Sequence, residues 1–200
     1  MEVALLEMLE ARERRVERQR RLLEEYHATL VCFTMNIAGP VKNSPLIRRG
    51  FVLGRRLLEE QFRVAGIRVL HSGESSENTG NEAIFVVDQE PLAVKALSVE
   101  IEDHTTAGRL FDMDVLCPDG RKVDRQELGL PGRRCLICGG PAQACARSRT
   151  HTVAQLQEKN RKPAGGGNPG GRPGLCCPAG LSGAAVRGGH HPKAWPGGPE

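Results

Sequence analysis

The sequence predicts an α+β fold with α/β-like alternation: a central mixed sheet of about four to five strands with flanking helices. Two observations support this class. Short, β-prone apolar runs alternate with longer segments whose apolar residues recur at helical spacing, and this alternation ends near residue 160. Beyond that point, residues 161–200 hold 12 of the 24 glycines and 7 of the 13 prolines.

The first three expected elements are a helix, a strand and a helix. Residues 2–26 place charges between apolar positions, as one surface helix or two would. Residues 30–37 form a continuous apolar run closed by Gly39-Pro40, which predicts a buried strand. Residues 46–65 have helical spacing, and Ser44-Pro45 supplies an N-cap and first-turn signal.

Three more strands are expected further along the chain. Residues 67–71 and 83–87 have strand character, and the polar stretch 72–82 between them is interpreted as a loop. Residues 111–116 form the last clear strand, ended by a turn at 118–120.

Residues 92–101 combine two patterns. The first half has helical character and the second half alternates like a strand, so we expect a short helix that runs into a strand. Glu100 and Glu102 would then lie on its polar face.

Arginines are frequent in the N-terminal helix, but glutamates lie within helical pairing distance of them. We therefore expect solvated ion pairs within the helix rather than a phosphate-binding face.

The composition divides the chain into a domain, residues 1–160, and a tail, residues 161–200. The tail cannot bury enough apolar surface to offset its chain entropy and is expected to be disordered. The chain has a net charge of +4, and the tail carries five basic residues against Glu200, so the domain is neutral. With aromatics at only 4%, this argues against nucleic-acid binding.

The chain shows no signal for membrane insertion or secretion. No stretch approaches the ~20 apolar residues of a membrane span, and the start is acidic and amphipathic. Seven cysteines, an odd number clustered late, fit thiols or metal ligands better than a disulfide framework. We expect a cytoplasmic protein without a membrane partner.

Asp112 and Asp114 stand two residues apart inside the last expected strand. Side chains at i and i+2 of a strand point to one face, so the two carboxylates would project together. Such hard oxygen ligands suit Mg²⁺ or Mn²⁺ bound with substrate phosphates, and Arg109 lies where a phosphate would arrive. The alternative is a solvated strand terminus.

A second candidate metal site follows, with the spacing C-x2-C-x6-C-x5-H. Its members are Cys135, Cys138, Cys145 and His151. Three thiolates and an imidazole suit a structural Zn²⁺ site. The alternatives are a metal-free cysteine cluster or a redox pair.

Three stretches together resemble one family. They are the run from Leu30 to Arg49, Gly108 to Val115, and Pro131 to Cys138 with Cys145 and His151 following. In order and with few gaps, residues 3–160 resemble the apo-citrate lyase phosphoribosyl-dephospho-CoA transferases, the citrate lyase holo-acyl-carrier-protein synthases. The tail departs from that pattern and is of the kind that out-of-frame translation of a GC-rich gene gives.

The resemblance implies a transferase of nucleotidyltransferase class, with a nucleotidyltransferase-like fold by analogy. It would use triphosphoribosyl-dephospho-CoA as substrate. A serine of the citrate lyase acyl-carrier (gamma) subunit would attack the α-phosphate and release pyrophosphate. Asp112 and Asp114 would hold Mg²⁺ on the triphosphate.

Further residues take roles under the same resemblance. Candidate phosphate-binding residues are Lys42, Arg48, Arg49 and Arg109. Asn43 would bond phosphate or help cap the following helix. Glu102, or Glu100, would be a third metal ligand or the base that deprotonates the carrier serine.

Two other functions are compatible with the sequence. One is a non-enzymatic zinc-binding adaptor that docks an acidic partner through basic residues. The other is a related transferase that acts on another carrier protein, such as that of malonate decarboxylase.

Overall fold

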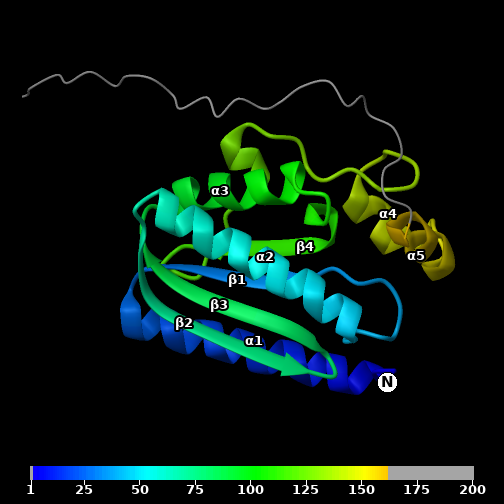
Figure 1. The fold of residues 1–200 in the computed structure, drawn as a ribbon, viewed down its shortest axis with the longest axis horizontal. Coiled ribbons are helices and arrows are strands. Elements are labelled where there is room, and N and C mark those ends of the chain that lie inside the picture. Colours follow the sequence, from blue (N-terminus) through cyan, green and yellow to red (C-terminus); the bar gives the residue numbers. More distant parts are fainter. Residues whose placement is uncertain (1, 162–200) are drawn as a thin grey trace, which may run out of the picture. The chain divides into compact units, whose positions relative to one another are not determined.

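A computed structural model describes residues 2–161 of the chain. It contains four strands and five α-helices, joined in part by two short 3₁₀ helices, η1 and η2 (Figure 1). In chain order these are α1 (Leu5–Tyr26), β1 (Thr29–Met35), α2 (Pro45–Val64), β2 (Arg68–Glu77), β3 (Gly80–Asp88), α3 (Pro91–His104), η1 (Gly108–Leu110), β4 (Phe111–Leu116), η2 (Arg125–Leu128), α4 (Ala142–Ser148) and α5 (Val153–Arg161). The α+β class expected from the sequence is confirmed. The predicted tail lies, apart from Arg161, outside the described residues.

The sheet has the strand order β2-β3-β1-β4, and all three strand pairs are antiparallel. The prediction of a mixed sheet was therefore wrong, although the expected number of strands was right. β2 and β3 form a hairpin, and β1 lies between β3 and β4, so the first strand of the chain is central. Cys32 of β1 faces Ile84 on one side and Asp114 on the other.

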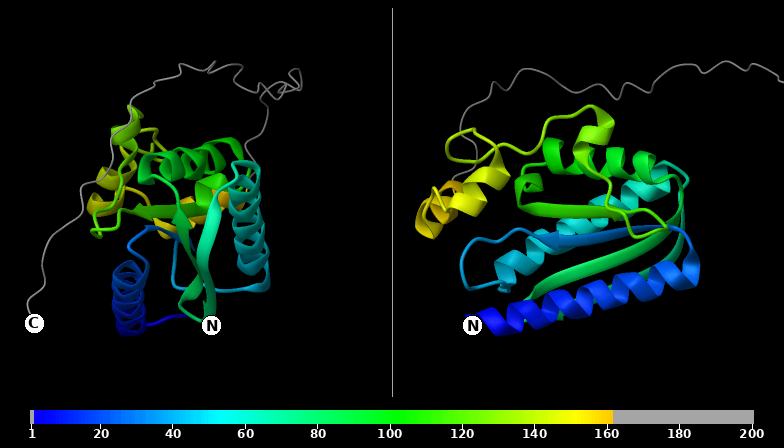
Figure 2. Two further views of the ribbon diagram at one scale, coloured as in Figure 1. Left: turned by 90° about the vertical axis from the view of Figure 1, so that its left-hand side faces the viewer. Right: turned by 180° about the vertical axis from the view of Figure 1, so that it is seen from behind.

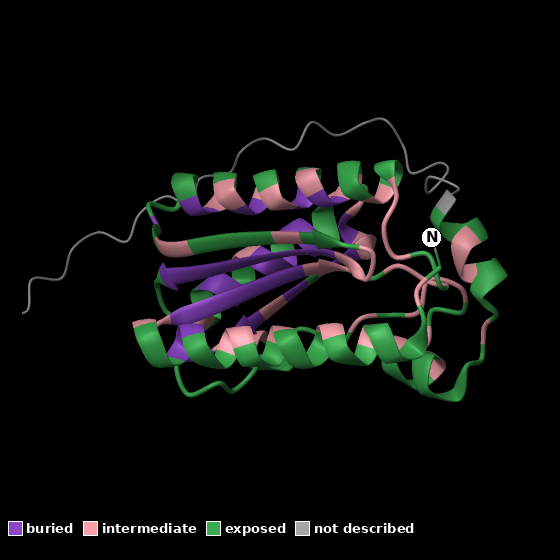
Figure 3. Ribbon diagram, turned by 90° about the horizontal axis from the view of Figure 1, so that it is seen from below, coloured by how far each residue is buried: buried purple, intermediate pink, exposed green. Residues whose placement is uncertain are grey.

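Helices cover both faces of the sheet: α2 and α3 pack on one face and α1 on the other (Figures 1 and 2). The core under α2 and α3 is rich in aromatic side chains, with Phe33 stacked on Phe51 and in edge contact with Phe111. Under α1 the core is smaller and aliphatic. Figure 3 shows the buried residues concentrated on the strands between these layers.

The stretch 72–82 was predicted to be a loop, but most of it forms the β2–β3 hairpin. β2 is an edge strand whose side chains are exposed or half-buried throughout. An edge strand of this kind needs no apolar alternation, so its polar sequence resembled a loop. The turn that joins the two strands is only two residues long.

The prediction for residues 92–101 was also wrong, because a single helix runs from Pro91 to His104. Its buried positions recur at helical spacing, but three of them are polar: Lys95, Ser98 and Glu102. These polar residues interrupted the apolar pattern and imitated a strand. Glu102 is therefore buried, whereas Glu100 is exposed and lies 3.2 Å from His104.

The predictions for the first helix and for the start of α2 are confirmed. Residues 5–26 form one helix rather than two, and α2 begins at Pro45. The hydroxyl of Ser44 accepts a hydrogen bond from the backbone N–H of Ile47 at 3.2 Å, so it caps α2 as expected. Among the described residues, no helix is long and apolar enough to cross a membrane.

Candidate functional site

β4 carries the two aspartates on the face that points away from the aromatic core. Phe111, Met113 and Val115 are buried, whereas Asp112 is exposed and Asp114 half-buried. Asp112 lies opposite Thr34 of β1. The two carboxylates therefore share one face of the strand, as the spacing predicts.

The electrostatic surroundings of this pair favour a bound cation. The pKa of Asp112 is raised, first because the surrounding protein displaces water from its carboxyl and second because Asp114 is close. Lys122 forms an ion pair with Asp114 at 2.6 Å, and this contact helps to raise the pKa of Lys122. Two neighbouring carboxylates provide hard oxygen donors of the kind that Mg²⁺ prefers.

Asp112 lines a pocket of about 170 Å³ together with residues from the N-terminal half of α1. Three cationic side chains line the same pocket: Arg12 and Arg15 from α1, and Lys42 from the loop after β1. Thr34 contributes to the wall beside Asp112. A carboxylate with three cations in one pocket suits a phosphate group that is bridged to the protein by a metal ion.

The arginines of α1 were expected to form solvated pairs, but two of them, Arg12 and Arg15, line this pocket. Among the described arginines of α1, Arg20 alone forms the expected ion pairs within the helix, with Glu17 and Glu24. Arg15 and Arg18 instead cross to Glu82 on β3, so the prediction of a solvated face was wrong for this part of the helix. Arginines three residues apart on one helical face were the available signal, but nothing local showed that this face meets the sheet.

The loop after β1 is fixed by side-chain bonds. The Lys42 ammonium donates to the carbonyl of Ile37 at 2.6 Å, and burial together with Arg12 lowers the pKa of Lys42. Asn43 donates to the carbonyl of Glu77 at 2.8 Å and accepts from the Asn81 amide at 3.2 Å. Asn43 thus ties this loop to the β2–β3 hairpin, which is a different role from capping α2.

The remaining candidate phosphate-binding residues lie outside the pocket wall. Arg48 and Arg49 are exposed in the first turn of α2. Arg109 is half-buried in η1, and its guanidinium donates to the carbonyl of Arg134. The structure therefore places Lys42 in the same pocket as Asp112 and leaves these three arginines outside its lining.

Glu102 is 3% exposed and lies on the core side of β4. Its carboxylate accepts a hydrogen bond from the backbone N–H of Met113 at 2.9 Å and pairs with Arg133 at 2.6 Å and Arg125 at 3.3 Å. A carboxylate that contacts three donors is fixed in one orientation, which suits a role in positioning β4.

The outer edge of β4 is closed by similar bonds. Lys95, a buried residue that sequence reasoning did not select, donates to the carbonyl of Met113 at 3.0 Å. Arg133 donates to the carbonyl of Phe111 at 2.7 Å, and the N–H of Val123 donates to Val115 at 2.8 Å. The backbone on either side of both aspartates is thereby fixed by partners outside the sheet.

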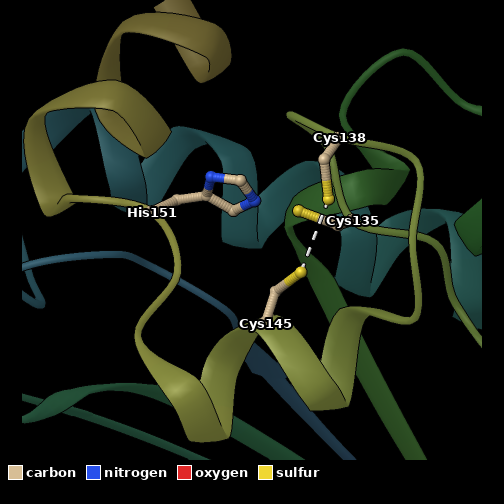
Figure 4. Close-up of side chains that lie close together, drawn as sticks. All are labelled: Cys135, Cys138, Cys145 and His151. Atoms are coloured by element: carbon tan, nitrogen blue, oxygen red, sulfur yellow. Dashed lines mark hydrogen bonds between the residues drawn. The ribbon is translucent and has the colours of Figure 1, made fainter.

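The structure brings the predicted cysteine and histidine ligands together (Figure 4). One ligand atom from each of Cys135, Cys138, Cys145 and His151 lies within 4.8 Å of all the others. The sulfurs of Cys138 and Cys145 are 3.5 Å apart. With Zn–S bonds of ~2.3 Å, two thiolates on a tetrahedral ion are separated by roughly 3.8 Å, so the cluster has the size of a zinc site.

Local structure prepares this cluster for a metal. Backbone N–H groups of Cys138 and Ile137 point at the Cys135 sulfur and lower the pKa of its thiol to about 6. Gly139 follows with φ of +71°, a conformation that favours glycine in this tight turn. The Nε2 atom of His151 is buried without a hydrogen-bond partner, although its ring faces the sulfurs. A buried, unpaired nitrogen beside three thiols is what a metal ion would satisfy.

The fold and these sites define a class of protein. It is an α+β protein with an acidic pair and a cationic pocket at one end of an antiparallel sheet, and it carries a Cys₃His cluster beside them. A model of the family "Apo-citrate lyase phosphoribosyl-dephospho-CoA transferase" matches residues 3–164, which include all of these features.

Similar proteins give the same result. A protein named apo-citrate lyase phosphoribosyl-dephospho-CoA transferase from Citrobacter koseri is 35% identical over 154 residues, which cover 77% of this chain and 84% of the relative. A protein named as the probable transferase from Vibrio cholerae serotype O1 is 38% identical over 161 residues, or 80% of this chain and 90% of the relative. The chain belongs to the family of apo-citrate lyase phosphoribosyl-dephospho-CoA transferases, which confirms the resemblance found in the sequence.

Proposed function

We propose that this chain transfers the phosphoribosyl-dephospho-CoA group from triphosphoribosyl-dephospho-CoA to the acyl-carrier (gamma) subunit of citrate lyase. The acceptor is a serine hydroxyl, and the product is a phosphodiester. Family membership supports the substrate and the partner. The observation that carries the assignment of the site is the pocket in which Asp112 faces Arg12, Arg15 and Lys42. The proposal includes the cytoplasmic location expected from the sequence.

In the proposed reaction the serine oxygen forms a bond to the α-phosphorus and releases its proton to solvent, and the bond from that phosphorus to pyrophosphate breaks with its electron pair leaving on pyrophosphate. This is nucleotidyl transfer in chemical class. Arg12, Arg15 and Lys42 would bind the triphosphate and stabilise the charge that develops on the leaving group. Asp112 and Asp114 would hold Mg²⁺, which supplies further charge neutralisation on the phosphates when bound.

The lowered pKa of Lys42 and the raised pKa of Asp112 belong to the same arrangement. Desolvation disfavours the charged form of both side chains, and a neighbouring charge of the same sign, Arg12 for Lys42 and Asp114 for Asp112, adds to that effect. An anionic substrate beside Lys42, and a cation beside Asp112, would relieve these costs. The pocket is therefore electrostatically prepared for a metal–phosphate ligand.

The decisive experiment is mass spectrometry of the apo acyl-carrier subunit after incubation with the full chain, Mg²⁺ and triphosphoribosyl-dephospho-CoA. We expect a mass gain equal to the prosthetic group, and a loss of at least about 100-fold in rate for Asp112→Asn. Asp88→Asn, at the exposed end of β3, is the matched control and should retain the wild-type rate. No mass gain, or equal rates for both variants, would refute the assignment.

Substrate binding can be tested separately through the cations. We expect Lys42→Met and Arg12→Gln each to raise KM for the triphosphate substrate about tenfold, because each removes one phosphate contact. Arg56→Gln, an exposed arginine on α2, should leave KM unchanged. If the apo carrier of malonate decarboxylase accepts the group equally well, the assigned partner is wrong.

The Cys₃His cluster is proposed to hold a structural Zn²⁺. Its donor set, its dimensions and the unpaired His151 nitrogen support this assignment. Native mass spectrometry of the purified chain should show one zinc ion, and Cys138→Ser should lose it. A metal-free chain that gains no zinc on titration would contradict the proposal.

A further inference from the structure

The segment that carries the Cys₃His cluster contacts, one at each of its ends, the two chain segments that contribute Asp112 and Lys42 to the pocket. The first contact lies just before Cys135. The Arg133 guanidinium donates to the carbonyl of Phe111 at 2.7 Å and pairs with Glu102 at 2.6 Å. Phe111 directly precedes Asp112, and Glu102 holds the N–H of Met113. Arg133, just before the cluster, therefore binds the Phe111 carbonyl directly and reaches the Met113 N–H through Glu102. We call this N-terminal part of the segment its first arm.

The second contact lies just after His151. Gln157 of α5 donates a hydrogen bond to the carbonyl of Ala38 at 3.1 Å. At the neighbouring Gly39, an added Cβ would come within 2.8 Å of the Gln157 amide and 3.1 Å of Val153, so α5 packs directly on this loop. The loop is the one that carries Lys42 into the pocket. Helix α5, the second arm, therefore packs against the loop that carries Lys42, which we call the cationic wall of the pocket.

The cluster is the point where these two arms meet. Cys135 is two residues from Arg133, and His151 is two residues from the start of α5. Between them lies only α4, a helix of seven residues that has no buried residue. Such a segment has little core of its own, so its shape depends on whatever joins Cys135, Cys138 and Cys145 to His151.

We propose that a metal ion in the Cys₃His cluster acts as a brace that fixes the acidic wall and the cationic wall of the pocket relative to each other. Arg133 transmits its effect to β4, and Gln157 transmits it to the loop after β1. Arg133 and Gln157 are thus positioning residues, and the cluster takes no part in bond making. The inference rests on the proposed zinc site but does not require transferase activity.

Hydrogen–deuterium exchange on the full chain tests this brace without substrate. Zinc-loaded protein is compared with protein stripped by a chelator, and peptides that cover residues 108–114 and 36–43 are followed. We expect exchange in both peptides to become about tenfold faster on stripping, because each loses charge-assisted or buried hydrogen bonds. A peptide over residues 83–87, in the middle of the sheet, is the internal control.

Two variants separate the arms while zinc stays bound. Arg133→Gln should speed exchange at residues 108–114 only, and Gln157→Ala at residues 36–43 only. Arg134→Gln is the matched control, since this side chain is exposed beside Arg133. Arg133→Lys should keep part of the protection that Arg133→Gln loses, because a lysine supplies the charge but not the planar guanidinium that contacts both Phe111 and Glu102.

The outcomes decide the proposal independently of the transfer assay. If stripping changes exchange only within residues 133–152, the cluster is a local fold element and the brace is refuted. If Arg133→Gln and Arg134→Gln behave alike, Arg133 is not the connection. Failure of the transferase assay with these exchange changes present would refute the proposed function and leave the brace intact.

Discussion

The two edges of the sheet are protected in different ways. β2, at one edge, exposes most of its side chains, has an irregular register between Val69 and His71, and carries charged residues that face solvent. β4, at the other edge, has its outward backbone groups bonded to Lys95, Glu102 and Arg133. The exposed and irregular β2 edge is protected only against pairing with other chains. The bonds along the β4 edge, in contrast, hold that strand in one position. The candidate site is on the second.

This difference predicts that acidic side chains at the two edges contribute unequally to stability. Glu102→Ala should lower the free energy of unfolding by about 3–5 kcal/mol, because it leaves two arginines and the Met113 N–H without their buried partner. Glu77→Ala on β2 removes an exposed ion pair with Arg14 of α1 and should lower the free energy of unfolding by less than about 1 kcal/mol. Urea unfolding measures both, and similar losses would contradict the comparison.

Glycines at the two edges should differ in the same direction. A Cβ at Gly108 would lie 2.3 Å from the carbonyl oxygen of Glu102, where the chain approaches β4. Gly108→Ala should therefore cost about 1–3 kcal/mol through forced backbone shifts. Gly73→Ala on β2 would meet only the His71 ring, at 3.5 Å, and is expected to be nearly neutral. Thermal unfolding of the two variants tests this, and a stable Gly108→Ala protein would show that the contact is not tight.

The bonds at the β4 edge also predict that the free energy of unfolding depends on pH. Burial lowers the pKa of Lys95 below its ordinary value of 10.5. Between the folded pKa and 10.5 the unfolded chain binds more protons, so stability should rise with pH in that interval. Lys95→Met removes the group and should flatten this rise in urea unfolding measured at increasing alkaline pH. Parallel profiles for wild type and variant would show that Lys95 titrates alike in both states.

The smallest effect on stability is expected at the β2 edge. Arg68 and Asp88 pair at 2.5 Å where β2 meets β3, but both side chains are largely exposed. A double-mutant cycle with Arg68→Ala and Asp88→Ala should give a coupling energy of about 0–1 kcal/mol that falls with added salt. A coupling comparable to the loss in Glu102→Ala would remove the distinction between the edges.

The contrast also explains which predictions from sequence succeeded. β1 and β4 were predicted correctly because their apolar residues are buried in the core. That Asp112 and Asp114 share one face of β4 follows from strand geometry alone. β2 was missed beyond His71 because an open edge imposes no apolar pattern. α3 was misassigned because it buries Lys95 and Glu102, whose partners are on a distant strand.

By itself the sequence determined the α+β class, the most apolar strands, the capped start of α2, the metal-ligand spacing of the Cys₃His cluster and the family. These depend on local propensity, on side-chain periodicity or on motifs of adjacent residues. Only the tertiary structure decided the antiparallel topology and the burial of Glu102 between two arginines. It also decided that Arg12 and Arg15 line the same pocket as Asp112. Each of these depends on contacts between residues far apart in the chain, and local sequence patterns do not encode such contacts.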